Sequence, residues 1–400
     1  MLGKIKTSPV FKAFFGFVHA AVLGVIDNLC LIFPVKATPS SKKKLLIVRP
    51  DGIGDFIIFL DTFKEYGKLY PSDKWEITLL GNRAWTDLAE RLPYSDENLF
   101  LDRKKFLSSP LHRFRILRKV RQTAFDTVIY PAFSREYFYG DAVVRVCAAG
   151  NKIGSEGDMC NIQSHRKKKS DRWYTKLIPS SKGPMNELDL NAEFIRGLGL
   201  DNFISSAPLY PLEVLPEPEG IISDTGIPYF VIAPSASWVG KRWPKERFAE
   251  LASLLNEQTG WTPVLCGEPN DTALAEEIMN DSPELPWKDL TGRLNLPGLM
   301  WLLRGGNMLV SNDSGVVHMA AAVGCPSLCI MGGGHFKRFF PYGDPGKNRI
   351  VYKKMDCYDC NWHCIYPVVK CLEEVTVDDA WEEASIILKS IDFEIIKTGG

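Results

Sequence analysis

The sequence predicts an α/β protein of two domains, each built on a parallel sheet, and three observations lead to this prediction. The chain has 400 residues, which is more than one hydrophobic core usually organises. Short apolar runs of strand length alternate with helical stretches in both halves. A proline-rich stretch at 208–228 separates the halves and suits a linker. We therefore expect a leader over 1–43, a first domain over 44–215 and a second domain over 216–400.

Composition and charge narrow the class of protein. Apolar residues make up 45% and charged residues 24%, which argues against disorder and against a polytopic membrane protein. Lys and Arg together number 48, and Asp and Glu together also number 48, so the formal net charge is zero. No overall positive potential therefore attracts nucleic acid, and any anionic ligand must be bound by local groups. Ten cysteines without a secretory signal favour a reducing compartment, so we expect a cytoplasmic protein.

The leader contains a nearly continuous apolar stretch at 10–33. On a helical projection, the polar and small residues Lys12, Gly16, His19 and Asp27 fall on one narrow stripe and leave a broad apolar arc. This pattern favours a helix that lies in a membrane interface, and we expect peripheral contact with the inner membrane. A helix docked on the protein's own core and a tilted transmembrane anchor are the alternatives.

Strand and turn signals place the elements of the first domain. The run LLIVR is bounded by lysines and by a turn rich in Pro and Gly, which is typical of a buried parallel strand. The stretch PDGIGD then opens a helix over 56–70. The expected strands lie at 45–49, 75–81, 97–102 and 125–132.

The same alternation resumes after the linker. In open parallel sheets ligands bind beyond the carboxyl ends of the strands, so functional residues are expected in the loops that follow them. The expected strands lie at 229–234, 262–267, 307–313 and 325–334, with helices that begin near Pro244 and at Gly315.

The loop after the first strand, DGIGD, carries a carboxylate where the two domains should face each other. Gly52 and Gly54 permit close backbone approach, and Asp55 stands near the helix start. Asp55 could instead simply cap the helix by accepting backbone N–H bonds. A dinucleotide-binding fingerprint fits poorly, because Ile57 stands where GxGxxG requires its third glycine.

Two loops of the second domain carry charges suited to a nucleotide. The segment PSASWVGKRWPKERF places Lys241 and Arg242 between a strand and a helix, with a solvated basic loop as the alternative. The turn CGEPND places Glu268 after a strand, where a carboxylate can accept the paired hydroxyls of a ribose. A capping turn led by Asp271 is the alternative there.

The most specific segment is NMLVSNDSGVVHMAAAVGCP. A strand runs into Asp313, Ser314 and Gly315, and the following helix carries His318 about one turn further on. Backbone N–H groups at such a helix start can hold a diphosphate, and His318 can point toward the same anion. A capped helix with a buried histidine explains each residue singly but not the cluster.

In this order, the motifs resemble the heptosyltransferase family of bacterial lipopolysaccharide synthesis, glycosyltransferase family nine. The resemblance rests on the strand with GIGD, on GKRWPKERFAELA, on CGE and on LTGRLNLPGLMWLLRGGNMLVSNDSGVVHMAAAVGCP, and it covers roughly 44–342. Ser314 stands where many members have threonine, and the leader is an addition. The resemblance implies a GT-B-like fold, with two Rossmann-like domains facing each other across a cleft, and an inverting transfer from ADP-heptose without a metal.

The resemblance also implies a role for each candidate residue. Asp55 would be the general base at the acceptor hydroxyl, Lys241 would assist catalysis by contacting the donor phosphates, and Glu268 would bind the donor ribose. We expect Asp55 to be ionised at neutral pH, as an ordinary aspartate is. The rest of the donor site would comprise Gly54, Ser237, Asp313, Ser314, Gly315 and His318.

The implied partners are a nucleotide-diphosphate-sugar donor, with ADP-heptose as the first candidate, and a lipid-linked saccharide acceptor of the lipopolysaccharide core type. The enzyme would meet this acceptor at the inner-membrane surface, and no nucleic acid is expected. Two alternatives retain the donor site: an enzyme of the same fold that uses another sugar for another surface glycan, and a non-catalytic nucleotide-sugar-binding protein.

Two further features suggest sites outside the cleft. Cys357, Cys360, Cys364 and Cys371 have the spacing of metal ligands and could hold a structural zinc or an iron–sulfur cluster, with redox or packing roles as alternatives, although the implied reaction requires no cofactor. The basic run HRKKKSDR at 165–172 could meet acceptor phosphates, with a mobile, solvated loop as the alternative.

Overall fold

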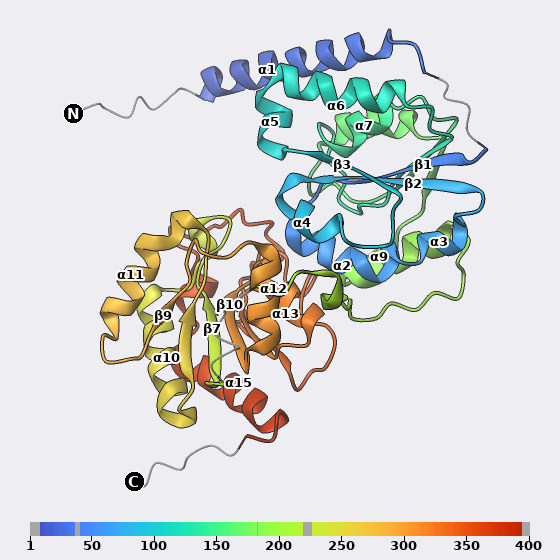
Figure 1. Cartoon of the computed structure of the whole chain (residues 1–400). Coiled ribbons are helices and arrows are strands. Elements are labelled where there is room, and N and C mark those ends of the chain that lie inside the picture. The colour runs from blue at the N-terminus through green and yellow to red at the C-terminus, as the bar shows by residue number, and fades with distance from the viewer. Residues whose placement is uncertain (1–8, 37–40, 182, 219–225, 394–400) are drawn as a thin grey trace.

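Two six-stranded sheets organise the chain (Figure 1). The computed structural model describes residues 9–36, 41–181, 183–218 and 226–393, with side chains from residue 16 onward. We call the half around the first sheet the first lobe and the half around the second sheet the second lobe. Every pairing between named strands is parallel, as the alternation of strands and helices predicted.

The two sheets have the same topology. The strand order is β3-β2-β1-β4-β5-β6 in the first and β12-β11-β10-β7-β8-β9 in the second, so each lobe has the order of a Rossmann sheet. The strands of the first sheet are β1 (Lys43–Arg49), β2 (Trp75–Asn82), β3 (Glu97–Leu101), β4 (Thr127–Tyr130), β5 (Asn151–Ser155) and β6 (Lys176–Ile178). Those of the second are β7 (Tyr229–Ala233), β8 (Thr262–Leu265), β9 (Lys288–Asp289), β10 (Met308–Asn312), β11 (Ser327–Ile330) and β12 (Asn348–Val351).

This topology fixes where a ligand should lie. The strand order reverses between β1 and β4 and again between β7 and β10, and the crevice of a doubly wound sheet opens beyond such a point. Asp313 lies in the loop after β10, and Asp55 lies in the first turn of α2, directly after the loop that follows β1.

Helices cover both faces of each sheet (Figure 1). In the first lobe, one face is covered by α2 (Ile53–Phe63) and α9 (Glu187–Gly197), and the other by α6 (Pro110–Gln122) and α7 (Gly140–Val146). In the second lobe, α12 (Leu296–Gly305) and α13 (Gly315–Val323) face the first lobe, and α10 (Lys245–Thr259), α11 (Thr272–Asp281) and α15 (Val377–Ser390) cover the far side. The short helices are α3 (Tyr66–Leu69), α4 (Thr86–Ala89), α5 (Arg103–Ser108), α8 (Ser164–Ser170) and α14 (Lys370–Glu373).

Some elements differ from the sequence prediction. The helix expected over 56–70 is divided into α2 and α3, and the last expected strand of the second sheet ends at Ile330. The strands β5, β6, β9 and β12 were not predicted, because they are short and lie toward the edges of the sheets, where apolar runs are weak.

The leader forms α1 (Pro9–Leu31), which packs on α6 and α7 along the outer side of the first lobe (Figure 1). Asp27 is buried and accepts hydrogen bonds from Arg113 Nε at 2.7 Å and Nη2 at 2.9 Å. His19 Nε2 lies 2.8 Å from the carbonyl oxygen of Leu107. Asp27 and His19 of the polar stripe therefore face the protein, so α1 is docked on the lobe, and part of its apolar arc is turned outward. The side chain of Lys12 lies outside the described residues. Within the described ranges, no helix combines the length and apolarity needed to cross a bilayer.

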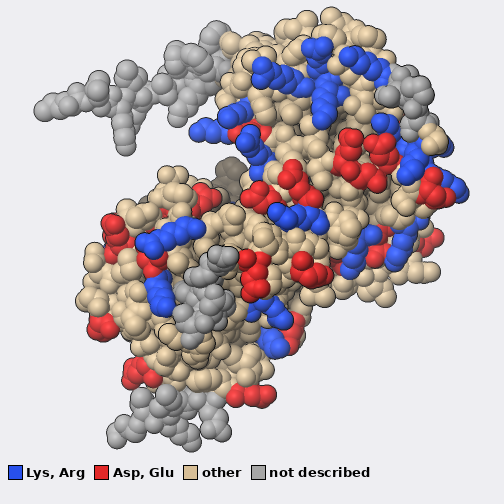
Figure 2. Space-filling model, viewed as in Figure 1, with Lys and Arg blue, Asp and Glu red and all other residues tan. Residues whose placement is uncertain are grey.

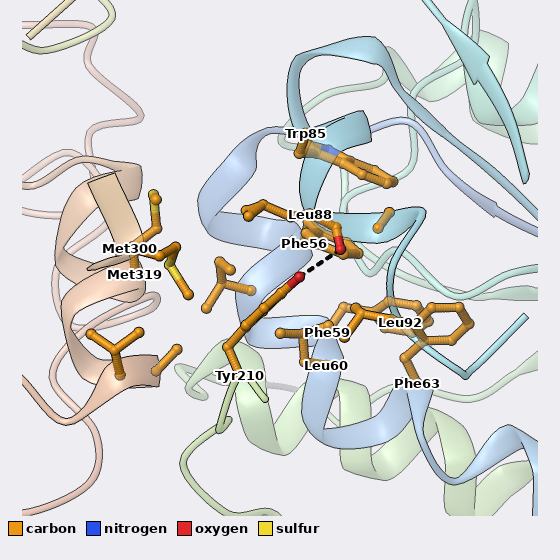
Figure 3. Packing of buried hydrophobic residues seen from close by; sticks show 14 of the residues in the cluster. Phe56, Phe59, Leu60, Phe63, Trp85, Leu88, Leu92, Tyr210, Met300 and Met319 are labelled. Carbon is orange, nitrogen blue, oxygen red and sulfur yellow. Dashed lines mark hydrogen bonds between the residues drawn. The ribbon is translucent and has the colours of Figure 1, made fainter. Parts of the chain in front are cut away.

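One hydrophobic cluster joins the lobes (Figure 3). Phe56 of α2 stacks on Trp85 with ring centroids 4.1 Å apart. Tyr210, in the segment that leads to the second lobe, donates a hydrogen bond from its hydroxyl to the carbonyl oxygen of Leu88 at 2.7 Å. Met300 of α12 and Met319 of α13 pack into the same cluster from the other side. This shared core holds α2 and α13 next to each other.

Candidate active site

The first turns of α2 and α13 meet between the two sheets. A Cβ atom on Gly54 would lie 2.6 Å from Cδ2 of His318 and 3.5 Å from Cα of Gly315. A Cβ atom on Gly315 would lie 3.4 Å from the backbone nitrogen of Gly54. Close contact thus requires glycine at position 54, and the structure brings together Gly54 and Gly315, which are 261 residues apart in sequence.

Asp55 stands in the first turn of α2 and is half-buried. Its Oδ2 accepts a hydrogen bond from the Gly52 backbone nitrogen at 3.2 Å, so Asp55 does cap the helix start. Beside it, the buried Arg49 donates from Nη2 to the backbone oxygen of Asp55 at 3.3 Å and pairs with Asp51 at 3.0 Å. The second carboxylate oxygen of Asp55 is left for another partner.

The electrostatic setting of Asp55 differs from the sequence expectation. Burial raises the pKa of Asp55 to about 7, with the carboxylates of Asp51 and Glu187 acting in the same direction and Arg49 opposing them. The expectation of full ionisation at neutral pH is therefore wrong, because it treated Asp55 as an ordinary solvated carboxyl. A carboxylate whose pKa lies near the working pH is well placed to act as a general base.

A cavity of about 300 Å³ opens beside Asp55 and is lined by both lobes. On its wall, Arg103 makes two hydrogen bonds of 2.8 Å to the carboxylate of Glu136. Arg338, from the loop after β11, reaches across the lobes and pairs with Glu187 at 3.0 Å. This charged lining suits a polar ligand rich in hydroxyl groups. None of these four residues was predicted from the sequence; Glu136 lies in the segment SREYFYG after β4, and no local motif marks the other three.

Lys241 lies on the opposite side of the crevice, in the loop after β7. Its Nζ lies 4.4 Å from the ring centroid of Trp362. Burial lowers the pKa of Lys241, against the carboxylates of Asp313 and Asp55, which raise it. Burial raises the pKa of Asp313 in turn, and Lys241 lowers it. Lys241, Asp313 and Asp55 therefore share one electrostatic environment.

The start of α13 has the features of an anion site. Ser314 is its N-cap residue, but no side chain caps the first turn in the described structure, so its backbone N–H groups can bind a ligand. His318 is buried, its Nδ1 lies 3.0 Å from the hydroxyl oxygen of Tyr342, and the two rings stack. Burial lowers the pKa of His318 to about 4, so the ring is neutral at pH 7 and brings no positive charge to an anion.

The remaining candidates lie at the rim of the second lobe. Glu268 and Ser237 are exposed. The turn that contains Glu268 is capped by Asp271, whose Oδ2 accepts from the Glu268 backbone nitrogen at 3.0 Å, as the alternative interpretation had it. Arg242 pairs with Asp271 at 3.2 Å, which links this turn to the loop that contains Lys241. Arg242, the second cation predicted for a nucleotide, is therefore already engaged in an ion pair.

The comparisons with known proteins decide the family. The sequence model described as glycosyltransferase family 9 (heptosyltransferase) matches residues 113–361. The chain belongs to glycosyltransferase family 9. Lipopolysaccharide heptosyltransferase 3 of Escherichia coli is 24% identical over 286 residues, which cover 70% of this chain and 80% of that protein. Lipooligosaccharide heptosyltransferase 2 of Haemophilus influenzae is 37% identical over 95 residues, 23% of this chain and 27% of that protein.

Solved glycosyltransferase structures share the fold. A family 9 glycosyltransferase from Veillonella parvula superposes with a TM-score of 0.69 at 19% identity and covers 88% of this chain and 99% of that one. E. coli heptosyltransferase WaaC, solved with ADP-2-deoxy-2-fluoro heptose, gives a TM-score of 0.62 at 18% identity, with 86% and 99% covered. The iron-containing dodecameric glycosyltransferase TibC of E. coli gives 0.53 at 16% identity, with 90% and 78% covered. The predicted GT-B-like fold of two Rossmann-like lobes is confirmed.

The four cysteines of the cluster lie near one another in this family 9 enzyme: burial raises the pKa of Cys371, and Cys357, Cys360 and Cys364 act in the same direction. Among the described residues, no three His, Cys, Asp or Glu side chains are arranged to hold a metal ion. Cys371 Sγ instead accepts from the Gly333 backbone nitrogen at 3.4 Å, and Cys364 Sγ contacts the Val368 carbonyl oxygen at 3.4 Å.

The basic run at 165–172 is mostly helical rather than a loop. It forms α8 and the turn after it, in which Lys167 pairs with Asp171 at 3.2 Å. Arg166 stacks over Phe138 at 4.7 Å, while Lys168 and Lys169 are exposed. Internal pairing therefore occupies part of the run.

Proposed function

We propose that this glycosyltransferase moves a heptose from ADP-heptose, with inversion, to a saccharide acceptor of the lipopolysaccharide core type. The observation that carries the proposal is the meeting of the Asp55 turn with the α13 N-terminus across the crevice. A base and a diphosphate site on opposite sides of one space are what an inverting transfer requires. The printed names of the relatives, and the ADP-sugar bound to WaaC, support heptose and ADP as first candidates.

In the proposed reaction, Asp55 takes the proton of an acceptor hydroxyl while that oxygen forms a bond to the anomeric carbon. The bond from this carbon to the diphosphate oxygen breaks on the opposite face, and ADP leaves with the electron pair. Lys241 and the first N–H groups of α13 stabilise the leaving diphosphate in place of a metal ion. The donor site comprises these groups together with Gly54, Ser237, Glu268 on the ribose, Asp313, Ser314, Gly315 and His318.

The proposal assigns the two substrates to different parts of the chain. Residues 44–215 would bind the acceptor, residues 216–400 the donor, and residues 1–43 would form the leader. The acceptor is lipid-linked, so the enzyme would work in the cytoplasm at the inner-membrane surface. The charged cavity beside Asp55 supports placing the acceptor saccharide there.

Replacing the base separates chemistry from donor binding. Asp55→Asn keeps the shape of the side chain but cannot accept a proton, so we expect transfer to fall by about 10²- to 10⁴-fold. ADP affinity, measured by calorimetry, should stay within about twofold of wild type. The matched variant Lys241→Met should instead weaken ADP binding. Wild-type transfer by Asp55→Asn, or loss of ADP affinity in the same variant, would contradict the proposed role.

A nucleotide-sugar panel distinguishes the alternatives. ADP-heptose should raise the melting temperature more than UDP-, GDP- or other ADP-sugars, because a ligand stabilises the state that binds it. A larger rise with another sugar would indicate a different donor. Donor binding by the wild type without turnover on any core saccharide would indicate a non-catalytic binding protein.

A further inference from the structure

Among the described residues, nothing packs on the outward face of α1, which forms an apolar ridge. From Val18 onward its exposed side chains are spaced by three or four residues, which places them on one face of the helix, and Phe17 adjoins the first of them. Phe17 is 74% exposed and Val25 is 57% exposed. Such exposed fractions are usual for polar side chains and unusual for large apolar side chains in a folded protein. The ridge comprises Phe17, Val18, Val22, Val25 and Leu29, and Ile32 continues it past the helix end.

The opposite face fixes this orientation. Leu23, Ile26 and Cys30 are buried against the first lobe. Between them, the buried Asp27 forms the ion pair with Arg113 of α6 described above. The helix cannot turn its ridge inward without breaking this buried pair, which would leave a charge unpaired in the core.

Two arginines, one from α6 and one from α7, lie beside the C-terminal part of α1. Arg118 of α6 lies 5.0 Å from the ring centroid of Phe33, just beyond the end of α1. Arg145 of α7 donates a hydrogen bond to Asn28 of α1. Figure 2 shows Lys and Arg side chains gathered over the end of the first lobe where α1 and α6 lie. Over residues 16–31, whose side chains the structure describes, α1 has no exposed acidic group.

We propose that the ridge of α1 is a docking surface for an anionic lipid bilayer, on which the helix lies parallel to the membrane plane. Apolar side chains enter the boundary between head groups and acyl chains, and the flanking arginines meet lipid phosphates. Two signals together, apolar area and positive charge, are what stable peripheral binding requires.

The face of α1 that packs on the first lobe lies beside a cavity that leads to the proposed acceptor site. His19 of α1 contacts the backbone of Leu107, and Leu107 lines a cavity of about 430 Å³. This cavity shares Glu136, Cys160 and Asn161 with the cavity beside Asp55. A lipid-linked saccharide could therefore pass from the bilayer to Asp55 along a continuous lining; this step rests on the proposed function, whereas bilayer docking does not.

Vesicle co-sedimentation of the full chain tests docking without donor or acceptor. We expect wild type to sediment with vesicles of phosphatidylethanolamine and phosphatidylglycerol, and less with phosphatidylcholine alone. The variant Val25→Asp/Leu29→Asp should lose at least about tenfold in partition coefficient, which corresponds to about 1.4 kcal/mol. Ile204→Asp is the matched control, because Ile204 is an 83% exposed aliphatic residue that follows α9 on the opposite side of the sheet. Equal melting temperatures would show that all variants fold.

Three results would overturn the proposal. The first is a wild type that stays in solution with every vesicle composition. The second is a Val25→Asp/Leu29→Asp variant that binds like wild type. The third is a wild-type dimer in ultracentrifugation that the same substitutions dissociate without changing vesicle binding, because the ridge would then contact a second copy. Transfer to a water-soluble, deacylated acceptor separates the two proposals, since the ridge variant should retain it if the proposed function holds.

Discussion

Gly54→Ala is expected to damage both stability and catalysis, because this glycine is where the lobes come closest at the site. The added Cβ would lie 2.6 Å from Cδ2 of His318, whereas carbon atoms pack at about 3.6 Å, so about 1 Å of displacement is needed. The imidazole cannot yield, since it is buried, stacked on Tyr342 and in hydrogen-bond contact with that hydroxyl. The first turns of α2 and α13 must therefore move apart.

The structure sets the magnitude and the controls. Overpacking of this kind costs about 1–3 kcal/mol in the free energy of unfolding, and a displacement of about 1 Å costs on the order of 10²-fold in kcat/KM. Urea denaturation and initial-rate assays measure the two quantities. Gly24→Ala is the matched control, because nothing lies within 4 Å of its added Cβ.

A double-mutant cycle identifies the clash. Removing the ring with His318→Ala should reduce the cost of Gly54→Ala, so the two losses in unfolding free energy should be non-additive by about 1–2 kcal/mol. Additive losses, or a Gly54→Ala protein with wild-type stability and rate, would refute the inference that α2 and α13 meet at this contact.

Three further predictions concern the charged groups. Transfer should fall about tenfold for each pH unit below about 7, because burial raises the pKa of Asp55 to about 7 and only its ionised form accepts a proton; a flat single-turnover profile from about pH 8 to about pH 5 would contradict this. Asp27→Ala should lower the free energy of unfolding by about 3–5 kcal/mol in urea melts, because it leaves the charge of the buried Arg113 unpaired. The double variant Asp27→Leu/Arg113→Leu should recover much of this loss, because it removes both charges. Trp362→Leu should raise the KM for donor about fivefold with little change in kcat, because it removes the ring beside Lys241; a change in kcat alone would count against this role.

Much of the fold could be predicted from the sequence because its signals are local. The middle of β1, Leu45 to Val48, is apolar and buried on both faces, and the glycines that follow mark the turn into α2. The α13 start is similarly marked by Asp313, Ser314 and Gly315 after an apolar strand. Such strand–turn–helix junctions need no knowledge of the rest of the chain.

The parts that could not be predicted depend on contacts between distant segments. Arg338 becomes part of the site only because the second lobe brings it against Glu187 of the first. The pKa of Asp55 follows from burial and from neighbours such as Glu187, which no local pattern places beside it. The inward direction of the polar stripe on α1 is set by Arg113, which lies 86 residues away from Asp27. Tertiary partners decide each of these properties.

The hydrophobic cluster between α2, α12 and α13 has a consequence for the GT-B-like architecture. Met300 and Met319 from the second lobe and Phe56 from the first are buried in the same cluster, which also includes Tyr210 of the connecting segment. Separating the lobes would expose all of them to water, at about 25 cal/mol for each Å² of apolar surface. The two lobes therefore share one hydrophobic core cluster, and the site lies beside the part of the core that they share.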